Sequence, residues 1–377
     1  MQLHIYSITT IIYIGGENRM NIFNKRIETI PIFFASDNNY APYLAVAIKS
    51  LLTNASNDYF YKIHILTTNL DKDISEKLTR LVTTNSSIQI ISLKDEIEHI
   101  KHRFQLRDYY SIETYYRFFI ADMFPQYDKV LYLDCDIVVL GDISNLYLTN
   151  ISNFLLGAVQ EQVMAHYKVF GDYVERALDV KVKNYFNAGV LLMNTKLFRA
   201  YQIQRKFFKL MNEFKFRVTQ DEDYLNVICK DKVKKLSLGW NKMPFEETGF
   251  DDIDLQLIHY TLGWKPWHYE NVLYEEYFWQ YAQQTEFYEQ IYRGLKGYTD
   301  EQRQKDKDGF ENLKMIAIED INDPCNYRNS MYRSKNYITR GLTSIAKLPY
   351  IKGIYRFIGS QGHKLLYEYT RDRERQE

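Results

Sequence analysis

Cysteine is scarce in this chain, and its three residues are far apart. Cys135, Cys229 and Cys325 form no Cys-x-x-Cys pair, and their number is odd. A framework of disulfide bonds or a zinc site is therefore not expected, and a reducing compartment such as the cytosol fits best.

The chain also lacks an excess of charge and a long apolar run. Lysine and arginine together number 48, as do aspartate and glutamate, which argues against a general binder of nucleic acid or another polyanion. No window holds the roughly 20 apolar residues that a transmembrane helix needs. The apolar stretch at 3–14 is short and lacks the basic start and cleavage site of a signal peptide. We expect residues 1–29 to be a dispensable extension, in which Met20 is a second candidate start.

The chain is long, has a high content of apolar residues, and alternates between strand-like and helix-like segments. Its 377 residues, 46% of them hydrophobic, suffice for one large domain with an appendage or for two domains. Alternating strand-like and helix-like segments predict an α/β fold with a largely parallel sheet covered on both faces. The expected strands are 30–35, 61–66, 88–93, 129–133, 154–160, 188–193 and 255–260, and the expected helices are 44–52, 71–84, 112–123, 201–216, 221–230, 275–293 and 299–317.

Two carboxylates directly follow one of these expected strands. Burying two bare carboxylates side by side is costly, because like charges repel in a medium of low dielectric constant. Side chains at i and i+2 of an extended segment share a face, so Asp134 and Asp136 can converge on one cation. Ligation by oxygen favours Mg²⁺, Mn²⁺ or Ca²⁺. A lone Asp-x-Asp is more often a solvated turn or a helix cap, but its place after a buried strand favours a metal site.

Further patches surround this pair in a definite order along the chain. They are, in turn, 37–40 (DNNY), 46–52 (VAIKSLL), 111–117 (SIETYYR), 131–136 (LYLDCD), 185–194 (YFNAGVLLMN), 220–226 (QDEDYLN), 258–260 (IHY) and 265–267 (KPW). This series resembles glycosyltransferase family 8, the retaining transferases that include bacterial lipopolysaccharide galactosyl- and glucosyltransferases. The resemblance covers residues 30–270.

The resemblance implies a GT-A fold, which is a mixed, mostly parallel sheet flanked by helices. It also implies a UDP-sugar donor and Mn²⁺, with Mg²⁺ as the alternative. Asp134, Asp136 and His259 match the metal ligands. A lone histidine beside apolar residues is more often packed in a core, but a set of two oxygens and one nitrogen suits Mn²⁺ and leaves room for two phosphate oxygens. The metal would neutralise the charge on the departing UDP as a Lewis acid.

The resemblance also assigns residues to the donor. Asp37, Asn39 and Tyr40 match the turn that holds uracil and ribose, although Asp37 or Asn39 can instead cap the next helix. Other matched residues are a cation near the diphosphate, two residues that line the donor sugar and a second cation at the phosphates: Arg117, Asn187, Ala188 and Lys265.

The catalytic assignment includes a departure from the family. Asp221 matches a carboxylate that binds sugar hydroxyls, and the residue after it is Glu222, where the family commonly has glutamine. A carboxylate there could be a nucleophile, or could stabilise an oxocarbenium-like transition state while the departing phosphate deprotonates the acceptor. The alternative is a glutamate that favours the dipole of a helix N-terminus. A second departure is Leu262, where the family usually has glycine; because Gly263 follows, we expect a loop shifted by one residue.

Beyond residue 275 the resemblance fades, and we expect 276–377 to form a C-terminal helical region with a basic, aromatic tail. The stretch 327–364 contains no acidic residue. Its basic residues alternate with aromatic and aliphatic ones, and they are Arg328, Arg333, Lys335, Arg340, Lys347, Lys352, Arg356 and Lys364. This composition is typical of an amphipathic surface on anionic lipid. Nucleic-acid binding and a helical cap on the catalytic domain are the alternatives.

These observations lead to one leading hypothesis and two alternatives. Residues 30–275 are expected to form the GT-A-like domain of a metal-dependent, retaining hexosyltransferase, which moves galactose or glucose from a UDP-sugar to a cell-surface glycan or glycolipid at the inner face of the cell membrane. A sugar-1-phosphate nucleotidyltransferase would need a glycine-rich, basic loop after the first strand, whereas 36–39 has no glycine. The complete set of three metal ligands, Asp134, Asp136 and His259, argues against a non-catalytic UDP-sugar-binding protein.

Overall fold

The protein is described by a computed structural model that covers residues 7–10, 23–98, 104, 111–245 and 249–333. The chain divides into two compact units, residues 1–321 and 322–377, which are described separately. The predicted boundaries after residues 29 and 275 remain predictions. Most of the predicted basic tail, from residue 334 onward, lies outside the described residues.

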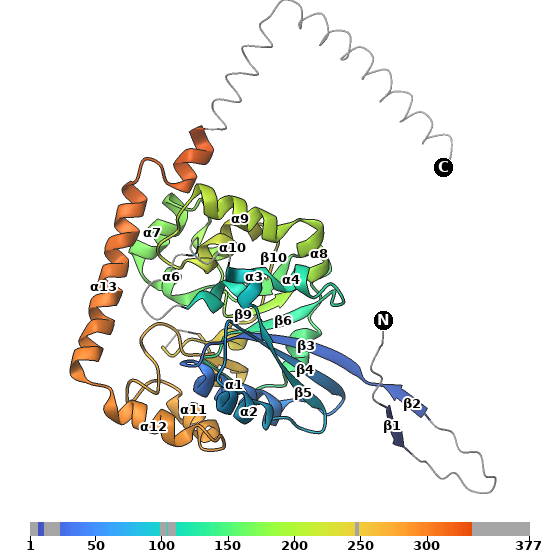
Figure 1. Ribbon diagram of the computed structural model, residues 1–377. Helices are drawn as coiled ribbons and strands as arrows, with labels where there is room; N and C mark the ends of the chain where they lie inside the picture. The colour runs from blue at the N-terminus through green and yellow to red at the C-terminus, as the bar shows by residue number, and fades with distance from the viewer. Residues whose placement is uncertain (1–6, 11–22, 99–103, 105–110, 246–248, 334–377) are drawn as a thin grey trace, which may run out of the picture. The chain divides into compact units, whose positions relative to one another are not determined.

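A seven-stranded sheet forms the centre of the first unit (Figure 1). Its order is β10-β8-β9-β6-β3-β4-β5. Strand β9 runs antiparallel to its neighbours β6 and β8, and every other neighbouring pair is parallel. The strands are β3 (Glu28–Ala35), β4 (Tyr59–Thr67), β5 (Ser86–Ser92), β6 (Val130–Leu133), β8 (Leu156–Ala158), β9 (Val190–Met193) and β10 (Val233–Lys235). The predicted α/β fold with a mixed, mostly parallel sheet is confirmed.

Strand β3 shows why the central strands form where they do. Ile32, Phe33 and Phe34 are all fully buried, so both faces of the strand are covered and its sequence is continuously apolar. Pro31 lies inside this strand. Its partner is Lys62 on β4, whereas the pairing with β6 is confined to Ile32 and Phe33. At Pro31, β3 therefore pairs with β4 alone, so the missing N–H of proline is tolerated there.

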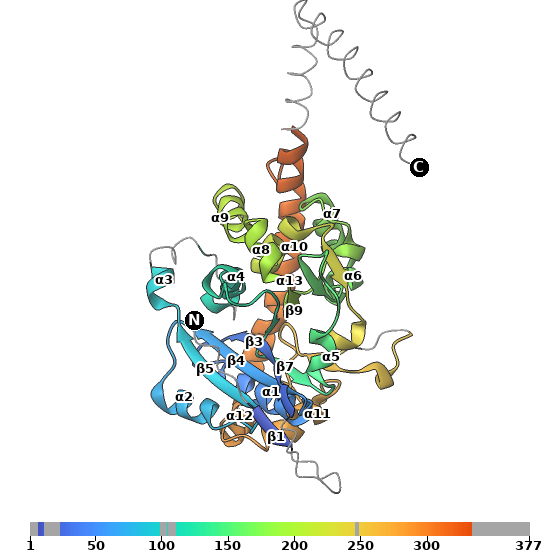
Figure 2. The same cartoon turned by 90° about the vertical axis from the view of Figure 1, so that its right-hand side faces the viewer.

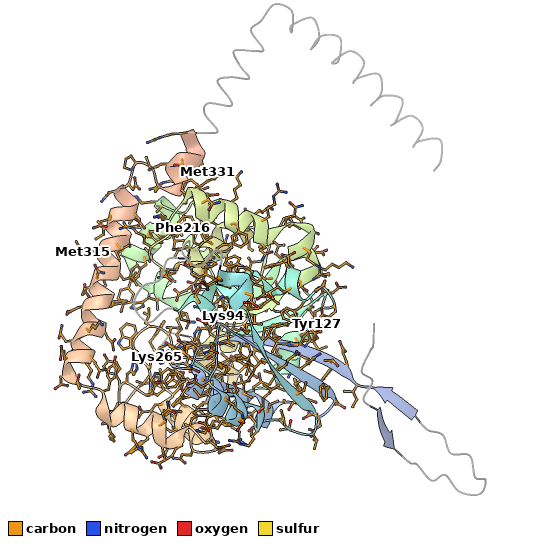
Figure 3. All side chains as sticks on the ribbon, viewed as in Figure 1. Lys94, Tyr127, Phe216, Lys265, Met315 and Met331 are labelled. Atoms are coloured by element: carbon orange, nitrogen blue, oxygen red, sulfur yellow. The ribbon has the colours of Figure 1, made fainter. Side chains whose placement is uncertain are left out.

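Helices cover both faces of the sheet (Figures 1 and 2). On one side lie α1 (Ala41–Asn54), α2 (Lys72–Thr79), α11 (Glu275–Ala282) and α12 (Tyr288–Gly297). On the other lie α4 (Ile120–Met123), α8 (Thr195–Ala200), α9 (Ile203–Glu213) and α10 (Asp221–Cys229). Side chains fill the space between these layers (Figure 3). The core is continuous from β3 and α1 to Phe278 and Ile291 on the C-terminal helices.

A small second sheet lies beside the large one. It consists of β7 (Ile137–Val139) and β11 (Leu257–His259), which pair antiparallel with Ile137 opposite His259. The remaining helices of the described residues are α3 (Lys94–Glu98), α5 (Ile143–Tyr147), α6 (Gln162–His166), α7 (Lys168–Arg176), α13 (Asp300–Asn322) and 3₁₀ segments at Ile112–Phe118, Val182–Asn184, Leu238–Asn241 and Asp252–Asp254. Near the N-terminus, β1 (Ser7–Thr10) and β2 (Phe23–Arg26) form an antiparallel pair.

The second unit is described only over residues 322–333. Residues 327–333 are helical, and the guanidinium of Arg328 lies 5.5 Å from the ring centroid of Tyr332. Over the described part of the chain, no helix has the length and apolar content needed to cross a membrane. The three cysteines are free; Cys135 and Cys229 are buried, and Cys325 is exposed.

Candidate active site

The carboxyl ends of β3 and β6 lie side by side at one edge of the sheet. The two strands pair in parallel, and the thiol of Cys135 donates a hydrogen bond to the backbone oxygen of Ala35 at 3.1 Å. Ligands of open α/β sheets collect at this kind of edge. Asp134 and Asp136 directly follow β6, so they lie where the sequence predicted a site.

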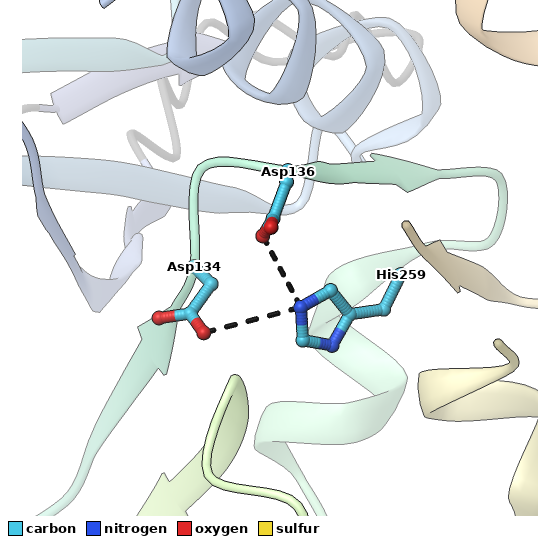
Figure 4. A group of neighbouring side chains, drawn as sticks. All are labelled: Asp134, Asp136 and His259. Atoms are coloured by element: carbon cyan, nitrogen blue, oxygen red, sulfur yellow. Dashed lines mark ion pairs between the residues drawn. The ribbon is translucent and has the colours of Figure 1, made fainter. Parts of the chain in front are cut away.

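The pairing of β7 with β11 brings a histidine to these carboxylates. The backbone N–H of Tyr260 donates to the backbone oxygen of Asp136 at 2.9 Å, which fixes the two segments together. Nε2 of His259 then lies 3.1 Å from Oδ1 of Asp136 and 3.9 Å from Oδ2 of Asp134 (Figure 4). One ligand atom from each of the three residues lies within 4.8 Å of the others. Two carboxylates and one imidazole in this arrangement suit a hard divalent cation such as Mn²⁺.

Asn241 determines which nitrogen of His259 faces the carboxylates. The amide nitrogen of Asn241 donates to Oδ1 of Asn187 at 2.8 Å, so its oxygen faces Nδ1 of His259 at 2.9 Å. An oxygen acceptor there places the imidazole proton on Nδ1 and leaves the lone pair of Nε2 for a metal. The sequence analysis missed Asn241, because an asparagine after a tryptophan carries no signal of a metal site by itself.

Gly189 provides the space for the histidine ring. A Cβ atom at this position would lie 2.2 Å from Cε1 of His259 and 2.7 Å from Oδ2 of Asp134. The backbone oxygen of Gly189 also accepts a hydrogen bond from the N–H of Asp134 at 2.8 Å. The residues that the sequence placed at the donor sugar, Asn187 and Ala188, therefore precede a glycine that packs directly against the metal-ligand cluster.

Arg117 is a buried cation between two carboxylates. One of its terminal nitrogens lies 3.0 Å from Oδ1 of Asp134, and its Nε lies 3.1 Å from Oδ2 of Asp221. Its other terminal nitrogen donates to the backbone oxygen of Ala188. Burial alone would lower the pKa of Arg117, but the carboxylates of Asp134 and Asp221 raise it above its usual value. The guanidinium therefore stays charged at the edge of the cluster.

Lys265 is a second buried cation on the opposite side of the cluster. Its ammonium group contacts Oδ2 of Asp136 and donates to the backbone oxygen of Tyr260. Burial alone would raise the pKa of Asp136, but the charge of Lys265 and the close contact with the ring of His259 hold it well below its usual value. Trp267, two residues on, stacks on Tyr43 of α1 with ring centroids 3.9 Å apart, which anchors the loop that carries Lys265.

Three further carboxyl groups are buried close by. Oε2 of Glu222 accepts hydrogen bonds from the N–H of Ala188 at 2.8 Å and from the amide of Asn187 at 3.1 Å. Burial raises the pKa of Glu222 well above its usual value, and the nearby carboxyl of Glu161 raises it further. Burial likewise raises the pKa of Asp221 to about 6, against the opposing charge of Arg117.

Glu161 was not among the predicted site residues. It is buried at the start of α6, where its Oε2 accepts a hydrogen bond from the N–H of Met164, and burial raises its pKa to about 7. Buried carboxyl groups that titrate near neutrality are typical of functional sites. A single glutamate in the loop after a short strand gives no such signal in the sequence.

Most of the predicted residues line one cavity in the structure. They are Arg117, Asp134, Asp136, Asn187, Ala188, Asp221, Glu222, His259 and Lys265. The predicted uridine turn is not part of this lining. Oδ1 of Asp37 accepts a hydrogen bond from the N–H of Tyr40 at 2.8 Å just before α1, and Asn39 is exposed. This hydrogen bond closes the turn before α1. The N-cap of α1 is Tyr40, and the helix has no side-chain cap. A role of Asp37, Asn39 and Tyr40 in binding a base stays a prediction.

The loop after His259 differs from our expectation. Leu262 has a φ of 56°, which is the left-handed conformation that glycine adopts most easily, and Gly263 is not among the residues with positive φ. Leu262 thus takes the backbone conformation expected of the family's glycine at its own position. A loop shifted by one residue is therefore not needed to place Lys265 in the cluster.

Comparison with known proteins identifies the family of this chain. The family model described as glycosyl transferase family 8 matches residues 31–271. The chain belongs to this family, as its sequence motifs predicted.

Individual relatives support the same assignment. The lipopolysaccharide 1,2-glucosyltransferase of Escherichia coli is 31% identical over 268 residues, which cover 67% of this chain and 77% of that protein. The lipopolysaccharide 1,3-galactosyltransferase of Salmonella typhimurium is 27% identical over 63% of this chain and 72% of that protein. The chain spans 64% of the length of a relative from Haemophilus influenzae and 35% of the glycosyltransferase GlyA of Streptococcus pneumoniae.

A solved structure shows the same fold. The galactosyltransferase LgtC, determined with donor and acceptor sugar analogues, is 26% identical, with a TM-score of 0.58 over 71% of this chain and 100% of that chain. This similarity and the family match together support a hexosyltransferase with a GT-A-like fold, and they leave no reason to retain a sugar-1-phosphate nucleotidyltransferase.

Proposed function

We propose that this protein is a metal-dependent, retaining hexosyltransferase that moves galactose or glucose from a UDP-sugar to a cell-surface glycan or glycolipid acceptor. The observation that carries the proposal is the convergence of Asp134, Asp136 and His259 in a cavity that also holds Arg117 and Lys265. The names of the E. coli and Salmonella relatives support glucose or galactose as the sugar and a lipopolysaccharide-like acceptor.

The donor set of the cluster fits a divalent cation held by Asp134, Asp136 and His259. When bound, the metal would supply Lewis-acid neutralisation of charge on a departing diphosphate. Arg117 and Lys265 hold the two carboxylates from opposite sides through their ion pairs. These cations orient the carboxylates, and they add positive charge next to the expected position of the phosphates.

Glu222 and Asp221 are the candidate catalytic residues. Glu222 is oriented by the N–H of Ala188 and the amide of Asn187, and it lies in the same cavity as the metal-ligand cluster. We propose that its ionised form acts either as a nucleophile toward the anomeric carbon or as a stabiliser of an oxocarbenium-like transition state. Asp221, held by the hydroxyl of Thr114 at 2.9 Å, is proposed to bind hydroxyl groups of the donor sugar.

A donor screen tests this function. We expect wild-type protein to release UDP from UDP-galactose or UDP-glucose when Mn²⁺ is present. We expect Asp136→Ala to lose at least about a hundredfold in rate, because it removes one metal ligand and the ion-pair partner of Lys265. Asp73→Ala is the control, since Asp73 is an exposed carboxylate on α2 that pairs with Lys77. A wild-type protein that retains the UDP-sugar without turnover would indicate a non-catalytic binding protein, and undiminished turnover by Asp136→Ala would refute the metal assignment.

We also propose that the protein works in the cytoplasm at the inner face of the cell membrane. The support is the composition of residues 327–364, in which basic residues alternate with aromatic and aliphatic ones and acidic residues are lacking. A membrane-bound enzyme would meet a lipid-linked acceptor on that surface.

A further inference from the structure

A second cavity lies beside the candidate active site, and most of its wall falls outside the family match. Its volume is about 560 Å³, within the range typical of ligand-binding pockets. The loop 262–269 forms one side, and Tyr298 at the end of α12 together with α13 forms the other. Because the family match ends at residue 271, the helical side of this cavity is a feature of the C-terminal region.

The second cavity adjoins the active-site cavity directly. Leu262 and Leu313 line both. Leu313 is a buried residue of α13, so the helix forms part of the wall of both spaces. A molecule that extends out of the active site past these two side chains would enter the second cavity.

The helical wall is fixed in place by polar contacts. The hydroxyl groups of Tyr269 and Tyr298 both donate to Oδ2 of Asp306, at 2.9 and 2.8 Å. Further along α13, Arg217 pairs with Glu319 at 3.1 Å and with Asp320. The outer face of α13, marked by Met315 in Figure 3, is exposed, so only the inner face of the helix is used for packing.

Flat aromatic side chains form much of the lining. Trp264 is 41% exposed although it is a large apolar residue, and its ring centroid lies 5.3 Å from that of Phe310. His268 stacks on Tyr298 with ring centroids 4.0 Å apart and ring planes 7° apart. An open tryptophan at the mouth of an aromatic cavity is typical of a binding site, since exposed apolar surface is otherwise unfavourable.

The polar groups of the lining favour a neutral ligand. Lys305 and Lys307 are offset by Asp306 and Glu311, so the wall has no net charge from these residues. Burial and the nearby charge of Lys265 lower the pKa of His268 to about 4, so its ring is neutral at physiological pH. A phosphorylated ligand would find no excess of cations here, whereas a sugar ring offers an apolar face to the aromatic rings and hydroxyl groups to the polar rim.

Leu262 separates the two cavities in a strained conformation. With a φ of 56°, the Cβ of Leu262 lies close to the following carbonyl oxygen, and a glycine would avoid this strain. Strain of this kind is often retained at functional sites. Here it places a leucine side chain at the passage from one cavity to the other.

We propose that the second cavity is a subsite for a neutral sugar ring of the acceptor glycan, beyond the ring that receives the hexose. This inference rests on the proposed transferase function, because it assigns the acceptor side of the same site. The subsite would let the enzyme distinguish an oligosaccharide from a single sugar.

Acceptor kinetics provide the test, with Trp264→Ala compared to wild type. The acceptors are core oligosaccharides released from lipopolysaccharide, and the methyl glycosides of galactose and glucose. We expect Trp264→Ala to raise the KM for the oligosaccharide about tenfold, from the loss of one stacking contact, and to leave the KM for methyl glycosides and the rate of donor hydrolysis unchanged. Trp264→Phe should restore most of the oligosaccharide affinity. Tyr292→Ala is the matched control, because Tyr292 is equally exposed at 41% but lies on α12 outside the cavity.

A binding measurement separates failure of this proposal from failure of the transferase function. We expect the oligosaccharide to change the tryptophan fluorescence of wild-type protein and not of Trp264→Phe, whether or not any donor is turned over. If both proteins turn over the donor and the KM for the oligosaccharide is the same in Trp264→Ala and in wild type, the proposal of a subsite is wrong. A fluorescence change caused by 1-decanol and not by the oligosaccharide would overturn it in favour of a lipid chain.

Discussion

At the scale of single residues, the account depends on how tightly the metal-ligand cluster is packed. The sequence predicted Asp134, Asp136 and His259 because the family motifs mark them. It could not predict that Asn241 would set the tautomer of His259, since that contact depends on a 3₁₀ segment, Leu238–Asn241, that the pattern of residues does not reveal. It also missed the carboxyl group of Glu161, because burial creates its altered pKa and burial of a single polar residue is not written in the sequence.

Glycine substitutions test the packing of the cluster. We expect Gly189→Ala to reduce UDP release at least about tenfold and to lower the free energy of unfolding by about 1–3 kcal/mol, because the new methyl group overlaps His259 and Asp134. Gly294→Ala is the control: nothing lies within 4 Å of the added atom, and alanine inside α12 should raise the free energy of unfolding by about 0.5–1 kcal/mol. Urea unfolding and UDP release measure both effects. Full activity of Gly189→Ala would mean that the ring of His259 lies elsewhere.

At the scale of elements, most strands were predictable, including the short strands β6, β8, β9 and β11, whereas the short strands β7 and β10 were not. Strands β3, β4 and β5 lie within a few residues of their predicted positions, because segments rich in isoleucine and aromatic residues are typical of strands. Strand β11 lies within the predicted strand 255–260, but its partner β7, which has only three residues, and the pairing of the two were not predicted. The single helix expected over 275–293 is two helices, α11 and α12, separated by a turn in which Thr285 bonds to its neighbours Ala282 and Phe287.

The packing of β4 against its neighbours predicts how stability depends on pH. His64 stacks on Phe33 with ring centroids 4.6 Å apart, and burial lowers its pKa to about 4 from the usual 6.5. The unfolded chain therefore binds a proton between pH 6.5 and 4 that the folded protein does not, so stability is complete above pH 6.5 and falls as the pH drops through this window. At pH 5, this residue alone lowers the free energy of unfolding by about 2 kcal/mol. The pKa of His268 is also lowered to about 4, so protonation of this residue in the unfolded chain lowers the stability over the same pH range.

Replacing the buried histidine tests this dependence. Urea unfolding at pH 7.5 and at pH 5.0 gives the drop in the free energy of unfolding between these two pH values. We expect this drop to be about 2 kcal/mol smaller in His64→Phe than in wild type. His166→Gln changes an exposed histidine at the end of α6. Its free energy of unfolding should change between the two pH values as much as that of wild type. An unchanged pH dependence in His64→Phe would mean that burial does not hold this ring neutral.

At the scale of the whole molecule, the sequence predicted the α/β fold and the helical character of the region after residue 275, but not how these helices pack. Most of the predicted site residues line one cavity because the motifs follow the carboxyl ends of neighbouring strands. The cavity between the loop 262–269 and α13 could not be predicted, because it depends on how helices beyond residue 271 pack on the family fold.

The proposed membrane contact is a property of the whole chain and is tested as such. We expect full-length protein to sediment with liposomes that contain anionic lipid and a chain that ends at Asp323 to stay in the supernatant, because the shorter chain lacks the basic residues of 327–364. Raising the salt concentration should release the full-length protein. If both chains sediment equally, the tail does not hold the protein on the membrane.

The most direct test of the central claim is the binding of Mn²⁺ itself, measured by electron paramagnetic resonance in the presence of UDP. The account predicts one bound Mn²⁺ per chain in wild-type protein and a loss of affinity of at least about tenfold in His259→Ala, with the exposed His166→Ala binding as wild type does. Equal binding by His259→Ala and wild type would contradict the assignment of Asp134, Asp136 and His259 as one metal site.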